Sequence, residues 1–130
     1  VGDPISNMLI AIKNAGVVKK PTVSFGYSKI KLAIAKILER EGFVKKAEVK
    51  GKKNGKVIEV EMIYEKTGGP KVSGVKRISK QSKRVYKGYR EIYKIKNGTG
   101  LAVYSTTRGL VTDTEARKAK LGGEVLFEIW

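Results

Sequence analysis

Three consecutive hydroxyl residues, Ser105, Thr106 and Thr107, lie between a short apolar run and the pair Arg108-Gly109. A nucleophilic role would need a base beside Ser105, but the chain has no histidine and no nucleophile-elbow pattern there. A Ser–Lys pair, a phosphorylation target and a plain turn closed by Gly109 remain alternatives. A turn does not need three hydroxyls, whereas hydroxyls that donate and accept can bond the 2′-OH and base edges in the shallow minor groove of RNA. These residues predict an RNA-reading loop, with Arg108 as its phosphate anchor.

A basic segment precedes this loop in the chain. Residues 66–90 hold nine cations and no acid, and Lys83 and Arg84 are among the cations. Tyr86 and Tyr89 lie in the same segment. Basic side chains follow a phosphate backbone, and a tyrosine can stack on a base or a sugar. Either tyrosine could instead pack on a sheet, but the density of cations predicts a nucleic-acid contact.

One acid stands out in this basic half. Glu124 follows Gly122-Gly123 at the start of the last predicted strand. Its carboxylate could accept a hydrogen bond from the amino group of a base, a donor that phosphate does not offer. The alternative is an exposed charge on an edge strand.

A second group of cations lies at the start of a predicted helix. Ser28 is its predicted N-cap, and Lys29 and Lys31 fall in its first turn. Cations are disfavoured there by a few tenths of a kcal/mol, but free N–H groups and two ammonium groups together suit a phosphate. Two solvated lysines that tolerate this small penalty are the alternative.

The charge balance of the whole chain points to a polyanionic partner. The 130 residues include 28 Lys+Arg and 12 Asp+Glu, a net charge of +16, of which residues 66–130 carry +10. Solubility needs a net charge of only about 2–8, so nucleic acid is the first candidate partner and an anionic membrane surface the second. No apolar run exceeds five residues and no signal-peptide pattern opens the sequence, so we expect neither a membrane span nor secretion. The chain has no cysteine, and we expect a cytoplasmic protein without cofactor, metal site or enzymatic activity.

The first half of the chain is predicted to fold as helix–strand–helix–strand–strand. Asp3 and Pro4 open a helix that Gly16 should end, and a second helix should run from Ser28 to Gly42. Strands are predicted at residues 23–25, 43–50 and 57–65, with a hairpin signal at Asn54-Gly55. The residues predicted to be buried on the two helices are Ile5, Met8, Leu9, Ile12, Ile30, Ala33, Ile34, Ile37 and Leu38.

The second half is predicted to be mainly β, with one short helix. Two glycines and a proline in residues 65–71 suggest a break, and strand-like pieces follow at 71–79, 84–88, 90–95, 100–105 and 124–130. Thr112 and Glu115 form a capping-box pattern that opens a helix, and Gly122-Gly123 should stop it. The prediction is an α+β protein of two small subdomains, residues 1–65 and 66–130.

The blocks just described resemble a known family. Residues 100–130, "GLAVYSTTRGLVTDTEARKAKLGGEVLFEIW", resemble the carboxy-terminal signature of small-subunit ribosomal protein eight of the bacterial type. The blocks "DPISNMLIAIKNA", "SKIKLAIAKILEREGF" and "KRISKQSKRVYK" match the rest of that family in order. The resemblance covers nearly the whole chain.

The resemblance implies a structural RNA-binding protein of the small ribosomal subunit. Such a protein would bind the central domain of small-subunit rRNA at an irregular helix, next to other small-subunit proteins, and would support assembly of the platform. In some bacteria, family members also repress translation of their own operon by binding a similar mRNA structure. A basic architectural DNA-binding or nucleoid-binding protein is the alternative, and it rests on charge alone.

The resemblance also assigns residues to the RNA contact. The hydroxyl loop would touch the minor groove of the rRNA. The other family positions map onto Lys13, Asn14, Ser28, Lys29, Tyr86, Gly122, Gly123 and Glu124, to which we add the cations Lys31, Lys83, Arg84, Arg108 and Arg117 and the loop's Gly109. The sequence departs from the usual family pattern at Gly26-Tyr27, Gln81-Ser82 and Phe127, outside the hydroxyl loop.

Overall fold

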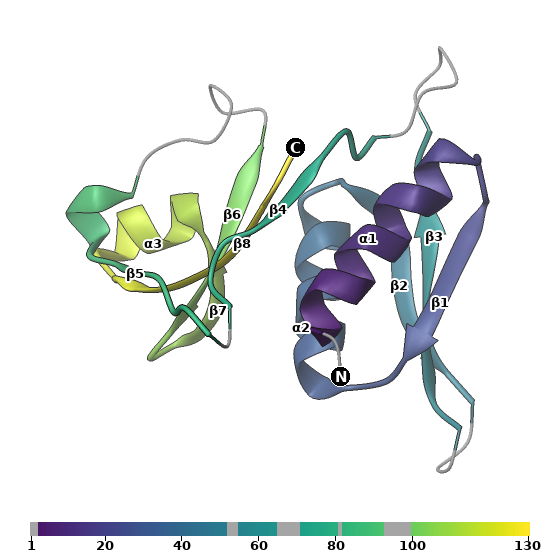
Figure 1. Ribbon diagram of the computed structural model, residues 1–130, viewed down its shortest axis with the longest axis horizontal. Coiled ribbons are helices and arrows are strands. Elements are labelled where there is room, and N and C mark those ends of the chain that lie inside the picture. The colour runs from purple at the N-terminus through teal and green to yellow at the C-terminus, as the bar shows by residue number, and fades with distance from the viewer. Residues whose placement is uncertain (1–2, 52–54, 65–70, 81, 93–99) are drawn as a thin grey trace. The chain divides into compact units, whose positions relative to one another are not determined.

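The computed structural model has two compact units, residues 1–73 and 74–130 (Figure 1). It describes residues 3–51, 55–64, 71–80, 82–92 and 100–130. Both units combine helices with a sheet, which confirms the predicted α+β class. The predicted boundary between residues 65 and 66 and the Asn54 half of the hairpin signal lie outside the described residues.

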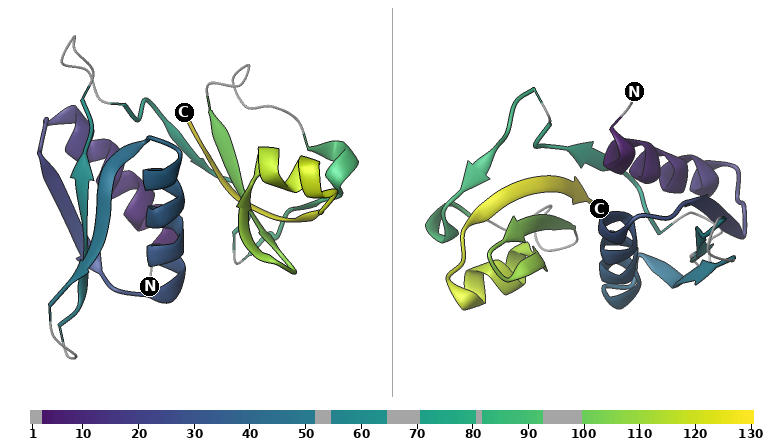
Figure 2. Two further views of the ribbon diagram at one scale, coloured as in Figure 1. Left: turned by 180° about the vertical axis from the view of Figure 1, so that it is seen from behind. Right: turned by 90° about the horizontal axis from the view of Figure 1, so that it is seen from below.

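The first unit is a three-stranded antiparallel sheet covered on one face by two helices (Figures 1 and 2). Its elements in chain order are α1 (Pro4–Val17), β1 (Thr22–Gly26), α2 (Lys29–Arg40), β2 (Val44–Lys50) and β3 (Val57–Met62). The strand order is β1-β3-β2. Along β3 the buried residues alternate with half-buried ones, as expected of a strand with one face against helices. The predicted element order of this half is confirmed.

Helix α1 begins as predicted and ends later than predicted. The Asp3 carboxylate accepts a hydrogen bond from the backbone N–H of Ile5 at 3.0 Å, and Pro4 occupies the first turn. The helix continues through Gly16, which is buried, to Val17. The left-handed residue that follows is Lys19, with a φ of 57°, so the predicted stop at Gly16 is wrong. A glycine can end a helix, but this one is buried inside the last turn of α1.

Helix α2 has its predicted N-cap, since Ser28 Oγ accepts a hydrogen bond from the N–H of Lys31 at 3.2 Å. The helix ends at Arg40, and Gly42 follows with a φ of 82°. Ile30 was predicted to be buried but is 41% exposed. Periodicity identifies the apolar face of a helix, but it does not tell how far along the helix the packing continues.

The second unit is built around its last strand, β8 (Gly123–Ile129). The other elements are β4 (Val75–Arg77), β5 (Tyr86–Lys87), a 3-10 turn η1 (Tyr89–Glu91), β6 (Leu101–Thr106), β7 (Gly109–Thr112) and α3 (Asp113–Ala119). The strand order is β4-β8-β6-β7, and β5 also pairs with β8, all antiparallel. Helix α3 packs on one face of this sheet, where Ala116 joins a buried cluster with Ala102, Tyr104, Val125 and Ile92.

Two of the extended segments of this unit differ from the sequence-based prediction. Residues 90 and 91 of the predicted strand 90–95 belong to η1, Ile92 lies outside any helix or strand, and residues 93–95 lie outside the described part. Strand β7 was not predicted, because its four residues contain too few alternating apolar positions to show a period. The hydroxyl loop is therefore the tip of a β6–β7 hairpin.

Helix α3 shows the predicted capping box. Thr112 Oγ1 accepts from the N–H of Glu115 at 3.2 Å, and Glu115 Oε1 accepts from the N–H of Thr112 at 3.0 Å. The helix ends before Lys120, whose φ is 55°, so the predicted stop at Gly122-Gly123 is wrong. No helix in the described ranges is long and apolar enough to cross a membrane.

Candidate nucleic-acid interface

Strand pairing brings three predicted site residues into one row. Glu124 of β8 lies opposite Tyr86 of β5 on one side and opposite Ser105 of β6 on the other. Directly paired residues of antiparallel strands project from the same face of a sheet. The next pair, Tyr104 and Val125, belongs to the cluster under α3. Tyr86, Glu124 and Ser105 therefore lie on the face opposite to α3, which we call the open face of the second unit.

The two tyrosines of the basic segment differ in environment. Tyr86 is 67% exposed, so its ring is available to a partner. Tyr89 is half-buried against the cluster under α3, and its hydroxyl accepts a hydrogen bond from Arg90 Nε at 3.2 Å. The alternative that a tyrosine simply packs on the sheet is thus right for Tyr89 and wrong for Tyr86.

Glu124 is part of a polar network. Its Oε2 accepts hydrogen bonds from Ser79 Oγ and from Arg84 Nη1, the latter at 3.1 Å. The Ser79 hydroxyl, with help from Arg84, holds the pKa of the Glu124 carboxyl below its ordinary value, although partial burial opposes this shift. Strand β8 has a partner on each side at this position, so the alternative of an exposed edge-strand charge is wrong.

Gly122 and Gly123 allow the neighbouring strands to approach this row closely. A Cβ on Gly123 would lie 2.3 Å from the carbonyl oxygen of Ser105, and one on Gly122 would lie 2.7 Å from that of Lys87. Both distances are far shorter than van der Waals contact. The glycine pair is therefore needed for β5 and β6 to flank β8, a role that the sequence-based reading as a helix stop did not identify.

The hydroxyl residues at the hairpin tip divide into two kinds. Thr106 Oγ1 accepts from the N–H of Arg108 at 3.1 Å and donates to the carbonyl of Gly109 at 2.9 Å, so it closes its own turn. Gly109 has a φ of 97°, which glycine adopts without steric cost. The Ser105 and Thr107 hydroxyls make no hydrogen bond to the described residues, and Thr107 is exposed. The plain-turn alternative fits Thr106, while Ser105 and Thr107 can bond a partner.

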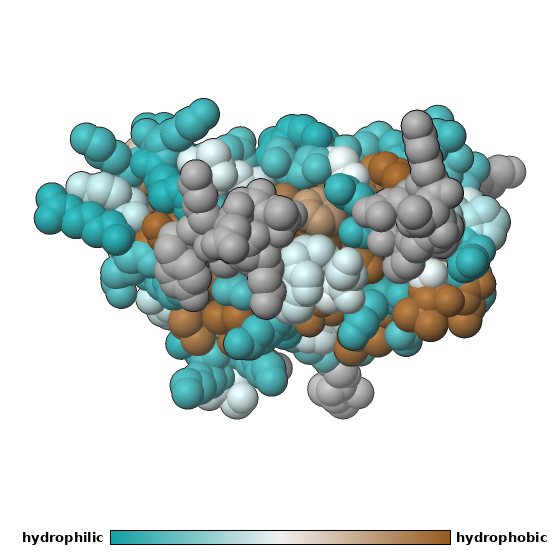
Figure 3. Space-filling view, turned by 90° about the horizontal axis from the view of Figure 1, so that it is seen from above, coloured by the Kyte–Doolittle hydropathy of each residue, from teal (hydrophilic) through white to brown (hydrophobic). Residues whose placement is uncertain are grey.

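Two cations of the basic segment, Lys83 and Arg84, lie next to the open face. Lys80 and Lys83 form an isolated β-bridge through two backbone hydrogen bonds of 2.9 and 3.0 Å, directly before Arg84. Lys83 is exposed, and the Arg84 side chain is 49% exposed although it pairs with Glu124. Gln81 lies outside the described residues. Hydrophilic side chains also project from this unit, on the left of Figure 3.

Arg117 does not join this surface. It lies on α3, on the other face of the sheet, and Nη1 bonds Asp113 Oδ2 at 3.1 Å. Nη2 also bonds Thr114 Oγ1 at 3.3 Å. Its charge is therefore held within the helix, and the structure separates it from the row of Tyr86 and Ser105.

The candidates of the first unit form two separate groups. Lys13 and Asn14 are exposed in the second half of α1, and Lys29 and Lys31 lie in the first turn of α2. The two helices begin at the same end of the unit, so these pairs lie toward opposite ends (Figure 1). Ser28 Oγ is engaged as the N-cap.

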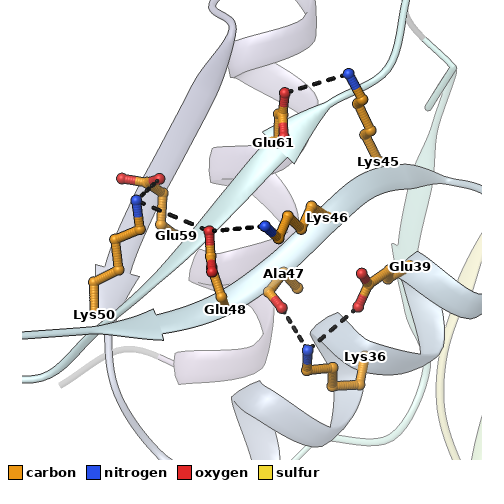
Figure 4. A network of polar contacts seen from close by, with 9 residues as sticks. All are labelled: Lys36, Glu39, Lys45, Lys46, Ala47, Glu48, Lys50, Glu59 and Glu61. Carbon is orange, nitrogen blue, oxygen red and sulfur yellow. Dashed lines mark hydrogen bonds and ion pairs between the residues drawn. The ribbon is translucent and has the colours of Figure 1, made fainter.

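The outer face of the β1-β3-β2 sheet is not a cationic surface. Lys50 Nζ lies 2.9 Å from Glu59 Oε1 and 3.9 Å from Glu48 Oε1, and Lys45 pairs with Glu61 at 3.6 Å (Figure 4). The Glu59 hydrogen bond is the main cause that raises the pKa of Lys50. These lysines face carboxylates of the same sheet, which makes the face a poor site for a polyanion.

One residue of the network was missed by sequence analysis. Ser79 is fully buried, and its hydroxyl joins Glu124 to the N–H of Val85. Its position inside the basic segment was the only signal in the sequence. That position does not indicate burial, because a serine that becomes buried there has no distinctive sequence pattern.

The comparisons with known proteins agree on one family. The family model of ribosomal protein S8 matches residues 3–130. A small ribosomal subunit protein uS8 from Endomicrobium trichonymphae is 42% identical over 130 residues, covering 98% of this chain and 98% of that protein. The uS8 proteins of Halothermothrix orenii and Caldanaerobacter subterraneus are 42% and 44% identical, and each alignment covers at least 97% of both chains. The resemblance predicted from the sequence is confirmed, and the chain belongs to the ribosomal protein S8 family.

Proposed function

We propose that the chain is a structural component of the small ribosomal subunit that binds small-subunit rRNA directly through the open face of the second unit. The observation that carries this proposal is the row of Tyr86, Glu124 and Ser105 across three paired strands. Segments far apart in the sequence meet there. The exposed aromatic ring, the cations and the Ser105 and Thr107 hydroxyls, which bond none of the described residues, suit one RNA surface. The relatives are small ribosomal subunit proteins by name, which supports a structural and non-enzymatic role.

The chemistry assigns different parts of the RNA to different residues. The exposed Tyr86 ring can stack on a base, and the Ser105 and Thr107 hydroxyls can bond 2′-OH groups and base edges in a minor groove. Arg108 and Lys83 can neutralise phosphates beside these contacts. Arg117 has no part in this proposal, because it lies on the opposite face.

Family membership extends the proposal to the target and the cell. We propose that the target is an irregular helix in the central domain of the rRNA, and that binding supports platform assembly next to other small-subunit proteins in the cytoplasm. We also propose that a similar structure in the mRNA of its own operon allows the protein to repress its own translation. Lys13, Asn14, Ser28, Lys29 and Lys31 would contribute weaker phosphate contacts from the first unit.

A chemical footprint on the cognate small-subunit rRNA tests the target. Protection of a short irregular helix in the central domain, retained in competition with duplex DNA, is the expected result. If duplex DNA competes for the protein as effectively as the rRNA itself and removes the protection, the architectural DNA-binding alternative would be favoured and the proposal contradicted.

Substitution of Ser105 tests the site. Ser105→Ala should weaken binding to the protected rRNA fragment by about 1–2 kcal/mol, the usual size of a lost hydrogen bond, and leave random RNA almost unaffected. The matched control is Ser24→Ala, which removes an exposed strand serine from the sheet of the first unit. Equal losses on the rRNA fragment and on random RNA would contradict a reading role for the hairpin.

A further inference from the structure

Glu124 is better placed to hold other residues of the chain than to read a base. Its side chain is only 17% exposed, and one oxygen already accepts two hydrogen bonds. One of these bonds comes from Ser79, whose exposure is 0%. A group buried to that extent cannot touch a macromolecule, so this part of the network acts within the protein.

The network fixes the segment that leads into β5. Ser79 Oγ donates to Glu124 and accepts from the backbone N–H of Val85 at 3.1 Å. Two backbone bonds join the same segment to β8, from the N–H of Ser79 to the carbonyl of Val125 at 3.0 Å and from the N–H of Val125 to the carbonyl of Val85 at 2.9 Å. Residues 79 and 85 are thus tied to one point of β8, and Tyr86 follows directly.

The same network orients Arg84 without using all its donors. A guanidinium has five N–H donors in a fixed plane, and Nη1 bonds Glu124 at 3.1 Å. The Arg84 side chain is half exposed, so its remaining donors can reach solvent or a phosphate. A carboxylate that holds one edge of the plane restricts the orientation of the other edges.

We propose that Glu124 and Ser79 form a clamp that positions Arg84 and Tyr86 for RNA, and that Glu124 does not itself read a base. This inference rests on the proposed rRNA binding. The clamp orders the free protein before the RNA arrives, which lowers the entropy cost of binding.

The test uses Ser79→Ala, Glu124→Gln and the double variant, in the full chain and at a temperature where each is folded. Each single change should weaken binding to the protected rRNA fragment about tenfold, because either one releases the same clamp. The double variant should lose little more than the larger single loss. Both single changes should also lower the slope of log affinity against log salt by about one, since Arg84 would no longer hold its phosphate.

The control is Thr112→Ala, which removes another buried hydroxyl of the same unit, at the cap of α3. It should change rRNA affinity by less than about twofold and leave the salt slope unchanged, because α3 is on the other face of the sheet. A loss from Thr112→Ala as large as that from Ser79→Ala would show that simple destabilisation explains the effect and would overturn the clamp. Wild-type affinity in Ser79→Ala with a loss in Glu124→Gln, or two losses that add, would show that Glu124 reads the RNA itself.

Should Ser79→Ala fail to fold, Glu124→Gln, Arg84→Ala and their double variant form a second double-mutant cycle, again measured by rRNA affinity. Affinity losses that do not add support the clamp, and losses that add overturn it.

Amide exchange of Val85 in the free protein separates the clamp from the proposed function. Glu124→Gln should speed this exchange about tenfold whether or not the wild type prefers rRNA to random RNA, and an unchanged rate would overturn the clamp.

Discussion

At the scale of single residues, the candidate interface depends on hydrogen-bonded side chains and on one glycine, which has no side chain. Glu124 is held by Ser79 and Arg84, Thr106 closes its turn, and Ser105 remains available to a partner. Gly123 must be a glycine, since any Cβ at this position would collide with the backbone of the neighbouring strand. The row of Tyr86, Glu124 and Ser105 is therefore set as much by close backbone packing as by hydrogen bonds between side chains.

Gly123→Ala should destabilise the second unit. The new Cβ would lie 2.3 Å from a carbonyl oxygen of β6, so β6 and β8 must separate, at a cost of about 3 kcal/mol. Urea unfolding measures this loss. The matched control is Gly26→Ala, also in a strand, where a Cβ meets nothing within 4 Å and the change should cost under about 1 kcal/mol. Equal losses in the two variants would contradict the packing role of Gly123.

The Glu124 network should make stability depend on pH in the acid range. The folded state lowers the pKa of this carboxyl below its ordinary 4.5, so its stabilising contribution is complete above about pH 4.5 and is lost as pH falls through the folded-state pKa. Wild type should therefore exceed Glu124→Gln in Tm most clearly near neutral pH, and the difference should shrink on acidification. A Tm difference that grows toward acid pH would contradict the hydrogen-bonded carboxylate.

At the scale of elements, the hydroxyl loop is a hairpin tip on a well-paired sheet. Strands β6 and β7 pair from Val103 and Thr112 to Thr106 and Gly109. The turn is closed by the Thr106 side chain and by the positive φ of Gly109. A rigid support of this kind presents Ser105 and Thr107 with little freedom to lose on binding.

Thr106→Ala should act on the hairpin first and on RNA second. Loss of the two turn bonds should cost about 1 kcal/mol of stability, and amide exchange at Arg108, whose N–H bonds the threonine, should become faster. Thr106→Ser keeps the hydroxyl and should restore both properties. Unchanged exchange at Arg108 in the alanine variant would show that the turn does not depend on this side chain.

At the scale of the whole molecule, the net charge of +16 should govern how the affinity for RNA responds to salt. The charges on the outer face of the first sheet are paired with one another, so the excess is carried by other surfaces, such as that of Lys83 and Arg84 in the second unit. Charge of this kind supplies non-specific attraction to nucleic acid, and in the proposed function the row on the open face adds selectivity.

Binding of rRNA should weaken steeply as salt rises. If about five phosphates are neutralised, affinity should fall by about three thousandfold to thirty thousandfold over one decade of salt concentration. Titrations of the rRNA fragment and of random RNA at several salt concentrations measure both slopes. The ratio of the two affinities should depend less on salt than either affinity does. An rRNA affinity that does not respond to salt would contradict phosphate neutralisation.

Local signals in the sequence determined much of this protein. The caps at Asp3, Ser28 and Thr112, the apolar face of α1 and the alternation in β3 each depend on neighbours within a few residues, and all were predicted. Composition indicated a polyanionic partner, and the carboxy-terminal block indicated the family. These features need no long-range contact to be recognised.

The tertiary structure alone decided which residues meet. The register that aligns Tyr86, Glu124 and Ser105 depends on strands that are far apart in the chain, and so does the burial of Ser79. The same long-range pairing decided that Gly123 is a close-approach site and that Arg117 lies on the opposite face. A sequence records the type of each residue, whereas the partners of a β-strand are selected by packing across the whole sheet.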